Sequence, residues 1–188
     1  MTPISLGIFA SANTTVGTSY ESIATVTVGS GGSANAEFTS IPATYTHLQI
    51  RGLVKGSAAA SGGLLCQANS DTGSNYTRHE LGGNGSTAYA YGAASQSAVN
   101  LYGNYDNLAN NDFPVAFVMD VLDYKDTNKY KTFRILSGMD KNGANYGEVF
   151  LKSSVWMSSS AITSLKFYIG GQNLGQYSHF ALYGIKGA

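Results

Sequence analysis

The sequence predicts an all-β protein, and three observations support this fold class. Apolar and polar residues alternate with a period of two in short runs such as "IATVTV" (23–28) and "SLKFYIG" (164–170). Such alternation is typical of strands that bury one face of an antiparallel sheet. Turn-forming clusters such as "GSGGS" (29–33) separate the runs, and no run has the period of a helix. We expect roughly eight to ten short strands, at the spacing of a sandwich or a barrel.

Other segments refine this expectation. The runs "THLQIRG" (46–52) and "HFALYGI" (179–185) also alternate. By contrast, "FPVAFVMDVLDY" (113–124) is apolar at both parities, which predicts a central strand covered on both sides. The region 82–111 is rich in Gly, Ser, Asn and Tyr, and it could form short edge strands or a long loop. Asn142-Gly143 predicts a type I′ hairpin turn.

Length and charge define the organisation of the chain. Its 188 residues suit one domain, which we divide into an N-terminal arm (1–19) and a β-sandwich domain (20–188). Charged residues make up only 12%, with 11 of each sign, so the formal net charge is zero. A neutral chain lacks the positive footprint of a nucleic-acid-binding protein. No run approaches the ~18 apolar residues of a membrane span. We therefore expect neither nucleic acid nor membrane as a partner, and low charge favours a protein that covers its surface in an assembly.

The segment "DTGS" (71–74) matches the signature around the catalytic aspartate of aspartic proteases. That chemistry needs two aspartates that share one proton. The other approximate copy, Asp126-Thr127-Asn128, has Asn in place of the glycine, so only a symmetric dimer could supply the pair. Asp71 also follows the polar approach Ala68-Asn69-Ser70, unlike the apolar run of the proteases. We favour an Asx-type turn at Asp71.

Metal sites and cofactors are not indicated by the spacing of potential ligands. His79-Glu80 lacks the second histidine of H-E-x-x-H, because Gly83 occupies that position. The segment "DKNGANYGE", which begins at Asp140, does not match the spacing of a calcium-binding EF-hand. The single cysteine, Cys66, lies in a strand-like run and is interpreted as a buried thiol. We expect no catalytic residue, no metal site and no cofactor.

Tyrosines offer a better binding hypothesis. Tyr89, Tyr91, Tyr102 and Tyr105 lie among Gly, Ala, Ser and Asn, a composition typical of adaptable recognition surfaces. They form a possible interaction surface, either between subunits, which we favour, or for stacking on sugar rings. Trp156 is interpreted as a core anchor at a strand end rather than as a sugar platform.

The chain resembles small structural proteins of tailed-bacteriophage virions. The resemblance lies in "YESIATVTVGSGG" (20–32), "FTSIPATYTHLQIRG" (38–52), "NSDTGSNYTRHELGGNGS" (69–86), "LDYKDTNKYKTFRILSGMDKNG" (122–143) and "HFALYGIKGA" (179–188). It implies a single antiparallel β-sandwich of jelly-roll type, a homo-oligomer with a trimer favoured, and a location in the virion. It implies no catalytic residues. The short chain, without a fibre shaft, favours a capsid decoration or cement subunit whose partners are major capsid or tail proteins.

Three functional hypotheses follow. The favoured one is a non-enzymatic structural protein of the virion. The second is a receptor- or glycan-binding module of the tail, baseplate or fibre, which predicts an exposed aromatic shelf formed by Tyr89, Tyr91, Tyr102 or Trp156. The third is a hydrolase built around Asp71.

Overall fold

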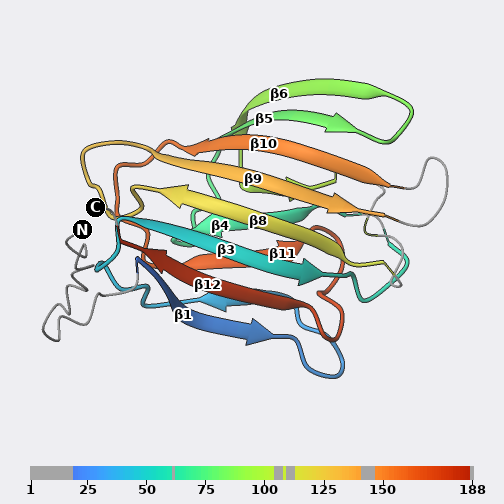
Figure 1. Ribbon diagram of the computed structural model, residues 1–188, viewed down its shortest axis with the longest axis horizontal. Coiled ribbons are helices and arrows are strands. Elements are labelled where there is room, and N and C mark those ends of the chain that lie inside the picture. The colour runs from blue at the N-terminus through green and yellow to red at the C-terminus, as the bar shows by residue number, and fades with distance from the viewer. Residues whose placement is uncertain (1–18, 61, 104–107, 109–112, 141–146, 187–188) are drawn as a thin grey trace, which may run out of the picture.

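The computed structural model describes residues 19–60, 62–103, 108, 113–140 and 147–186. These residues form twelve strands and no helix, arranged in two antiparallel sheets that pack together as a β-sandwich (Figure 1). The large sheet has eight strands, in the order β1 (Tyr20–Thr27), β12 (His179–Ile185), β3 (His47–Val54), β8 (Val115–Leu122), β9 (Lys131–Met139), β10 (Glu148–Trp156), β5 (Tyr76–Gly83) and β6 (Ala88–Gln96). The small sheet has four, in the order β2 (Ala36–Phe38), β11 (Leu165–Ile169), β4 (Leu64–Ala68) and β7 (Val99–Tyr102).

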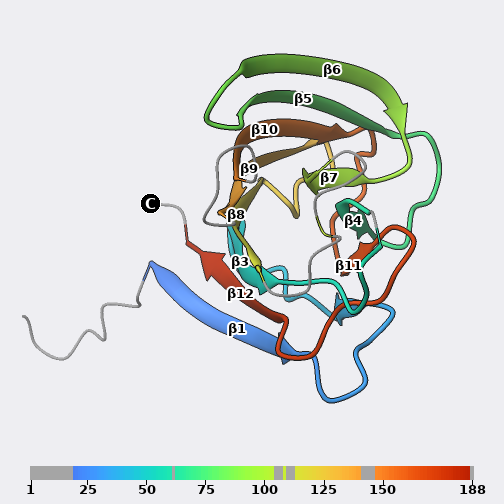
Figure 2. The ribbon, with the colours of Figure 1, turned by 90° about the vertical axis from the view of Figure 1, so that its right-hand side faces the viewer.

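The strand order of the two sheets follows one pattern. Each of the pairs β1/β2, β3/β4, β7/β8 and β11/β12 contributes one strand to each sheet. As a result β1-β12-β3-β8 in the large sheet matches β2-β11-β4-β7 in the small one, pair by pair. The remaining strands β9, β10, β5 and β6 extend only the large sheet beyond β8. The large sheet therefore has twice as many strands as the small sheet, and Figure 2 shows it curving around the small sheet.

The core lies between the sheets and is rich in aromatic rings. Phe167 of β11 is fully buried, and its ring centre lies 5.1 Å from that of Phe180 and 6.1 Å from that of Phe117 on the large sheet. These separations are within the range of favourable aromatic pairs. Burial alternates along the strands as the sequence predicts: on β9, for example, Phe133 and Ile135 face the core.

One strand departs from its prediction. β8 is central in the large sheet, but only its inward parity is buried, whereas Ala116 is exposed and Val118 is half-buried on the other face. The prediction of cover on both sides is wrong for the described chain, because the small sheet covers one face only. Burial within the described chain therefore does not explain the apolar residues that face outward on β8.

Of three further expectations, the described residues test the one for the region 82–111. The Gly-, Ser- and Tyr-rich region 82–111 contains two strands, β6 and β7, rather than one long loop. The expected N-terminal arm lies outside the described residues except for Ser19, which directly precedes β1. Asn142-Gly143 also lies outside them, although the strands on either side, β9 and β10, pair as antiparallel neighbours.

The aromatic core should dominate stability. Phe167→Ala removes a ring that contacts both Phe117 and Phe180, so we expect the free energy of unfolding to fall by about 3–5 kcal/mol. Urea denaturation followed by tryptophan fluorescence measures this change. Tyr177→Ala is the control, because Tyr177 is 72% exposed, and its loss should change stability by less than about 0.5 kcal/mol. Equal effects of the two substitutions would contradict this account of the core.

Candidate interaction surface

The tyrosines singled out in the sequence occupy different environments. Tyr102 is fully buried, and its ring packs edge-on against Phe150 at 5.4 Å. Tyr89 is half-buried against the same ring, and burial raises the pKa of its hydroxyl to about 12. Tyr91 is 50% exposed on β6. Tyr105 lies outside the described residues. The three described tyrosines therefore do not share one exposed surface.

Asp71 lies in a tight turn that crosses from β4 to β5, and its carboxylate is used there. The backbone N–H of Gly73 donates to Oδ1 at 2.8 Å, and the indole Nε1 of Trp156 donates to Oδ2 at 2.7 Å. The amide of Asn75 donates to both oxygens. The Trp156 hydrogen bond, followed by that of Asn75, lowers the pKa of Asp71. An ionised carboxylate that accepts four hydrogen bonds forms the expected Asx-type turn and anchors the buried Trp156.

The His79-Glu80 pair does not converge on one site. Neighbouring residues of a strand point to opposite faces, so His79 is exposed on the outer face while Glu80 is buried on the inner one. Across the described residues, no group of three or more His, Cys, Asp or Glu side chains is arranged to hold a metal ion. Cys66 is buried, which raises the pKa of its thiol. None of the described segments is a helix long and apolar enough to cross a bilayer.

The large sheet turns its outer face toward the viewer in Figure 1. This face carries a row of aliphatic side chains. Leu81 of β5, Leu151 of β10 and Leu136 of β9 lie directly opposite one another, and Val118 of β8 continues the row. The three leucines are 60%, 53% and 55% exposed. Together with a neighbouring row they form what we call the aliphatic patch: Leu53, Leu81, Leu136, Val149 and Leu151.

The neighbouring row contains two glycines, which have no side chain and therefore leave space beside the valine between them. Val149 lies opposite Gly83 on one side and Gly138 on the other, and it is 60% exposed. Beside it lies an open hollow of about 630 Å³ that these residues help to line. A second hollow, of about 620 Å³, lies over Leu81 and Leu151 where β6 presents small residues. The patch therefore has aliphatic ridges with spaces between them into which another surface can pack.

Charged groups border the patch rather than interrupt it. The next row along the strands contains His79, Ser153, Arg134 and Asp120, of which Arg134 and Asp120 lie opposite each other. The amide of Gln49 donates to Asp120 at 2.8 Å. An apolar centre with a polar border is the arrangement of a protein–protein interface.

The extent of the patch can be estimated from sheet geometry. Two outward rows, each taking about 6.6 Å of strand, cross five strands spaced about 4.8 Å apart and span roughly 300 Å². An apolar patch of this size is comparable to the largest patch on a typical monomer, about 300–600 Å², which is often functional. It is about a third of the roughly 800 Å² that one partner buries in a stable protein complex.

The patch was missed at the sequence level, although a signal for it was present. In "EVFLKSSVW" (148–156), Phe150 and Trp156 define the inward parity, yet Val149 and Leu151 are apolar on the other. "FPVAFVMDVLDY" shows the same feature. Apolar residues at both parities therefore indicated cover on both faces, but the residues that the structure describes cover only one.

The chain matches no known protein family, and searches of curated proteins and of solved structures also gave no match.

The Asp71 turn yields a pH-dependent prediction. We expect Asp71→Ala to lower the free energy of unfolding at pH 7 by about 1–3 kcal/mol, because the donors of Trp156 and Gly73 lose their acceptor. The folded-state pKa of Asp71 is lowered, so its contribution is present above the unfolded pKa of about 3.9 and is lost as pH falls through the folded value. Denaturation curves of both proteins at pH 7 and near pH 2 check this. A difference that persists unchanged at low pH would contradict it.

Proposed function

We propose that this chain is a non-enzymatic structural subunit of a bacteriophage virion, acting as a capsid decoration or cement protein. The observation that carries the proposal is the aliphatic patch, whose leucines and valine are about half exposed or more. Exposed apolar area of this extent is costly in water and is stabilised when another protein covers it. These exposed apolar side chains are better explained by contact with another protein than by the binding of a substrate.

The strand order supports the same proposal. Four strands of the large sheet, β1-β12-β3-β8, match the four of the small sheet, β2-β11-β4-β7, as pairs that cross between the sheets. We interpret this order as a jelly roll with two hairpins, β5-β6 and β9-β10, added at one edge. Jelly rolls occur in viral capsid proteins and in lectins, so this likeness is one of fold and carries less weight than the patch.

The composition fits a subunit surrounded by copies of itself and by other virion proteins. With 12% charged residues and no net charge, the isolated chain has little electrostatic repulsion to keep it apart from its neighbours. We propose a homo-oligomer, with a trimer favoured, that also contacts major capsid or tail proteins through its surface.

The glycan-binding alternative finds less support. It required an exposed aromatic shelf, but Tyr102 and Trp156 are buried, and Tyr89 packs against the core. Tyr91 is the exposed member, and the guanidinium of Arg78 lies against its ring at 5.0 Å from the ring centre. One ring in this setting does not form a platform for a sugar.

Charge placed in the patch should prevent association. We expect Leu151→Asp and Leu136→Asp each to weaken self-association by about 30-fold or more, as for a central contact residue, and to reduce co-sedimentation with phage particles. Light scattering coupled to size-exclusion chromatography measures the oligomer, and circular dichroism verifies the fold.

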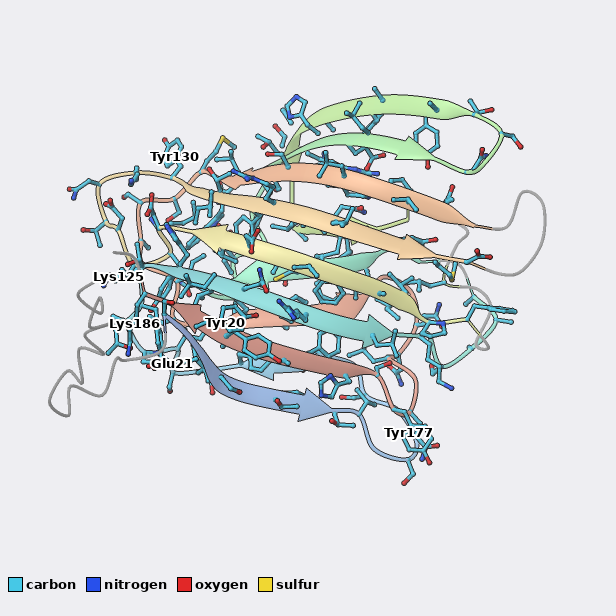
Figure 3. All side chains as sticks on the ribbon, in the orientation of Figure 1. Tyr20, Glu21, Lys125, Tyr130, Tyr177 and Lys186 are labelled. Carbon is cyan, nitrogen blue, oxygen red and sulfur yellow. The ribbon has the colours of Figure 1, made fainter. Side chains whose placement is uncertain are left out.

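Tyr177→Asp is the matched control. Tyr177 is 72% exposed and lies before β12, at the far side of the molecule from β9 and β10 (Figure 3). It should leave association intact. The proposal fails if the wild-type chain is a monomer without affinity for particles, or if the Leu151 and Tyr177 variants behave alike.

A further inference from the structure

A cluster of charged and polar side chains lies between the sheets, where β5 and β10 cover β7. Arg78 and Glu80 extend inward from β5, Lys152 from β10 and Asn100 from β7. Arg78, Glu80 and Lys152 are only 7%, 4% and 2% exposed. They occupy inward positions of their strands, in line with the apolar core residues. Lys, Glu and Arg are almost never buried to this degree unless they are paired.

The contacts within the cluster converge on one amine. Lys152 Nζ lies 2.6 Å from Asn100 Oδ1 and 2.9 Å from Glu80 Oε2. Glu80 Oε2 also accepts hydrogen bonds from Arg78 Nε and Nη2, at 2.9 and 2.7 Å. The other carboxylate oxygen, Oε1, is buried and has no hydrogen-bond partner in the described part of the chain. A buried lysine and a buried carboxylate thus meet the side chain of Asn100, which is itself partly buried.

The charges in this cluster do not balance. Two cations, Arg78 and Lys152, surround the single carboxylate of Glu80, and Glu148 acts on Lys152 only as a minor influence. A buried charge without full compensation is strongly unfavourable. Conversion of Lys152 to a neutral amide would leave Arg78 and Glu80 as a matched pair.

We propose that Lys152 and Asn100 react with each other to form an isopeptide bond that joins the two sheets, with Glu80 as the catalytic carboxylate. The inference does not depend on the proposed virion function.

The reaction needs no cofactor or oxidant. Glu80 Oε2 takes a proton from the Lys152 ammonium, and the neutral Nζ then attacks Cγ of Asn100. The new Nζ–Cγ bond forms and the Cγ–Nδ2 bond breaks. Glu80 then passes its proton to the departing Nδ2, and the attacking Nζ loses a second proton, which also goes to Nδ2. Because the lysine began as an ammonium, the leaving group is an ammonium ion. The product is one amide bond, and the carboxylate is regenerated.

The surroundings favour this step. A C=O bond is about 1.2 Å long, so Cγ of Asn100 lies at most about 3.8 Å from Nζ, close to the separation of reacting groups held for attack. Burial lowers the pKa of Lys152 to about 8, which makes the neutral amine accessible. The ring of Phe150, 4.2 Å from Nζ, and the buried Tyr102 beside it limit access by water. Aminolysis is therefore favoured over hydrolysis of Asn100.

The leaving group is held apart from the nucleophile. Asn100 Nδ2 donates to the carbonyl oxygen of Gly103 at 3.0 Å, so the amide oxygen faces Lys152 while its nitrogen faces the chain of the small sheet.

Mass spectrometry of the purified full-length protein, incubated at pH 9, tests the proposal directly. We expect an intact mass lower than that of the sequence by one ammonia molecule. Trypsin should release a branched peptide that joins residues 79–125 to residues 142–166, because acylated Lys152 is no longer cleaved. A protein of unaltered mass that yields separate peptides after this incubation would overturn the proposal, whatever the behaviour of any variant.

Three variants separate the chemistry from a structural role. Lys152→Arg and Glu80→Gln should each show the mass of its own sequence, without the loss of ammonia. The first lacks the nucleophile, and the second lacks the proton acceptor. Asn100→Asp should still form the bond, now with loss of one water molecule. Circular dichroism identifies any variant that fails to fold. Retention of the ammonia loss in folded Glu80→Gln or Lys152→Arg would contradict the assigned roles.

Discussion

The packing of two sheets of unequal width is the constraint on which the rest of the structure depends. The small sheet can cover only part of the large one, and the aromatic cluster around Phe167 fills the space where the two overlap. Apolar contact between sheets supplies most of the favourable free energy of such a sandwich. Everything outside this overlap has to be stabilised in another way: by curvature of the large sheet, by polar contacts beneath β5 and β10, or by a covering protein.

The two unusual regions of the molecule both follow from this mismatch. Beneath β5 and β10 lies β7, and the chain places Arg78, Glu80 and Lys152 there, where a continuous apolar layer would otherwise be expected. On the opposite side of the same strands, no described residue covers the aliphatic patch. The added hairpins β5-β6 and β9-β10 therefore create a buried polar site on one face and an apolar surface on the other.

Much of the fold could be predicted from the sequence, because it depends on local alternation. The runs that contain Val26, Ile50 and Phe167 became β1, β3 and β11, since β3 and β11 bury one parity and β1 partly buries one. β6 was harder to predict because Ala, Gly and Ser give an edge strand little apolar contrast. The buried cluster was missed because its residues come from three strands far apart in the sequence. Its signal was nevertheless present: Lys152 shares the inward parity of Phe150, where a charged residue is out of place.

The position of β12 affects when the fold can form. This strand, His179–Ile185, lies between β1 and β3 and pairs with both, so β1 has no neighbour in the large sheet until β12 has been synthesised. Domains generally fold as units while the ribosome releases them. Here the earliest strand must wait for the latest one, and the sandwich closes only after nearly the whole described chain has left the ribosome. Until then the apolar face of β1 is open to chaperones and to other nascent copies.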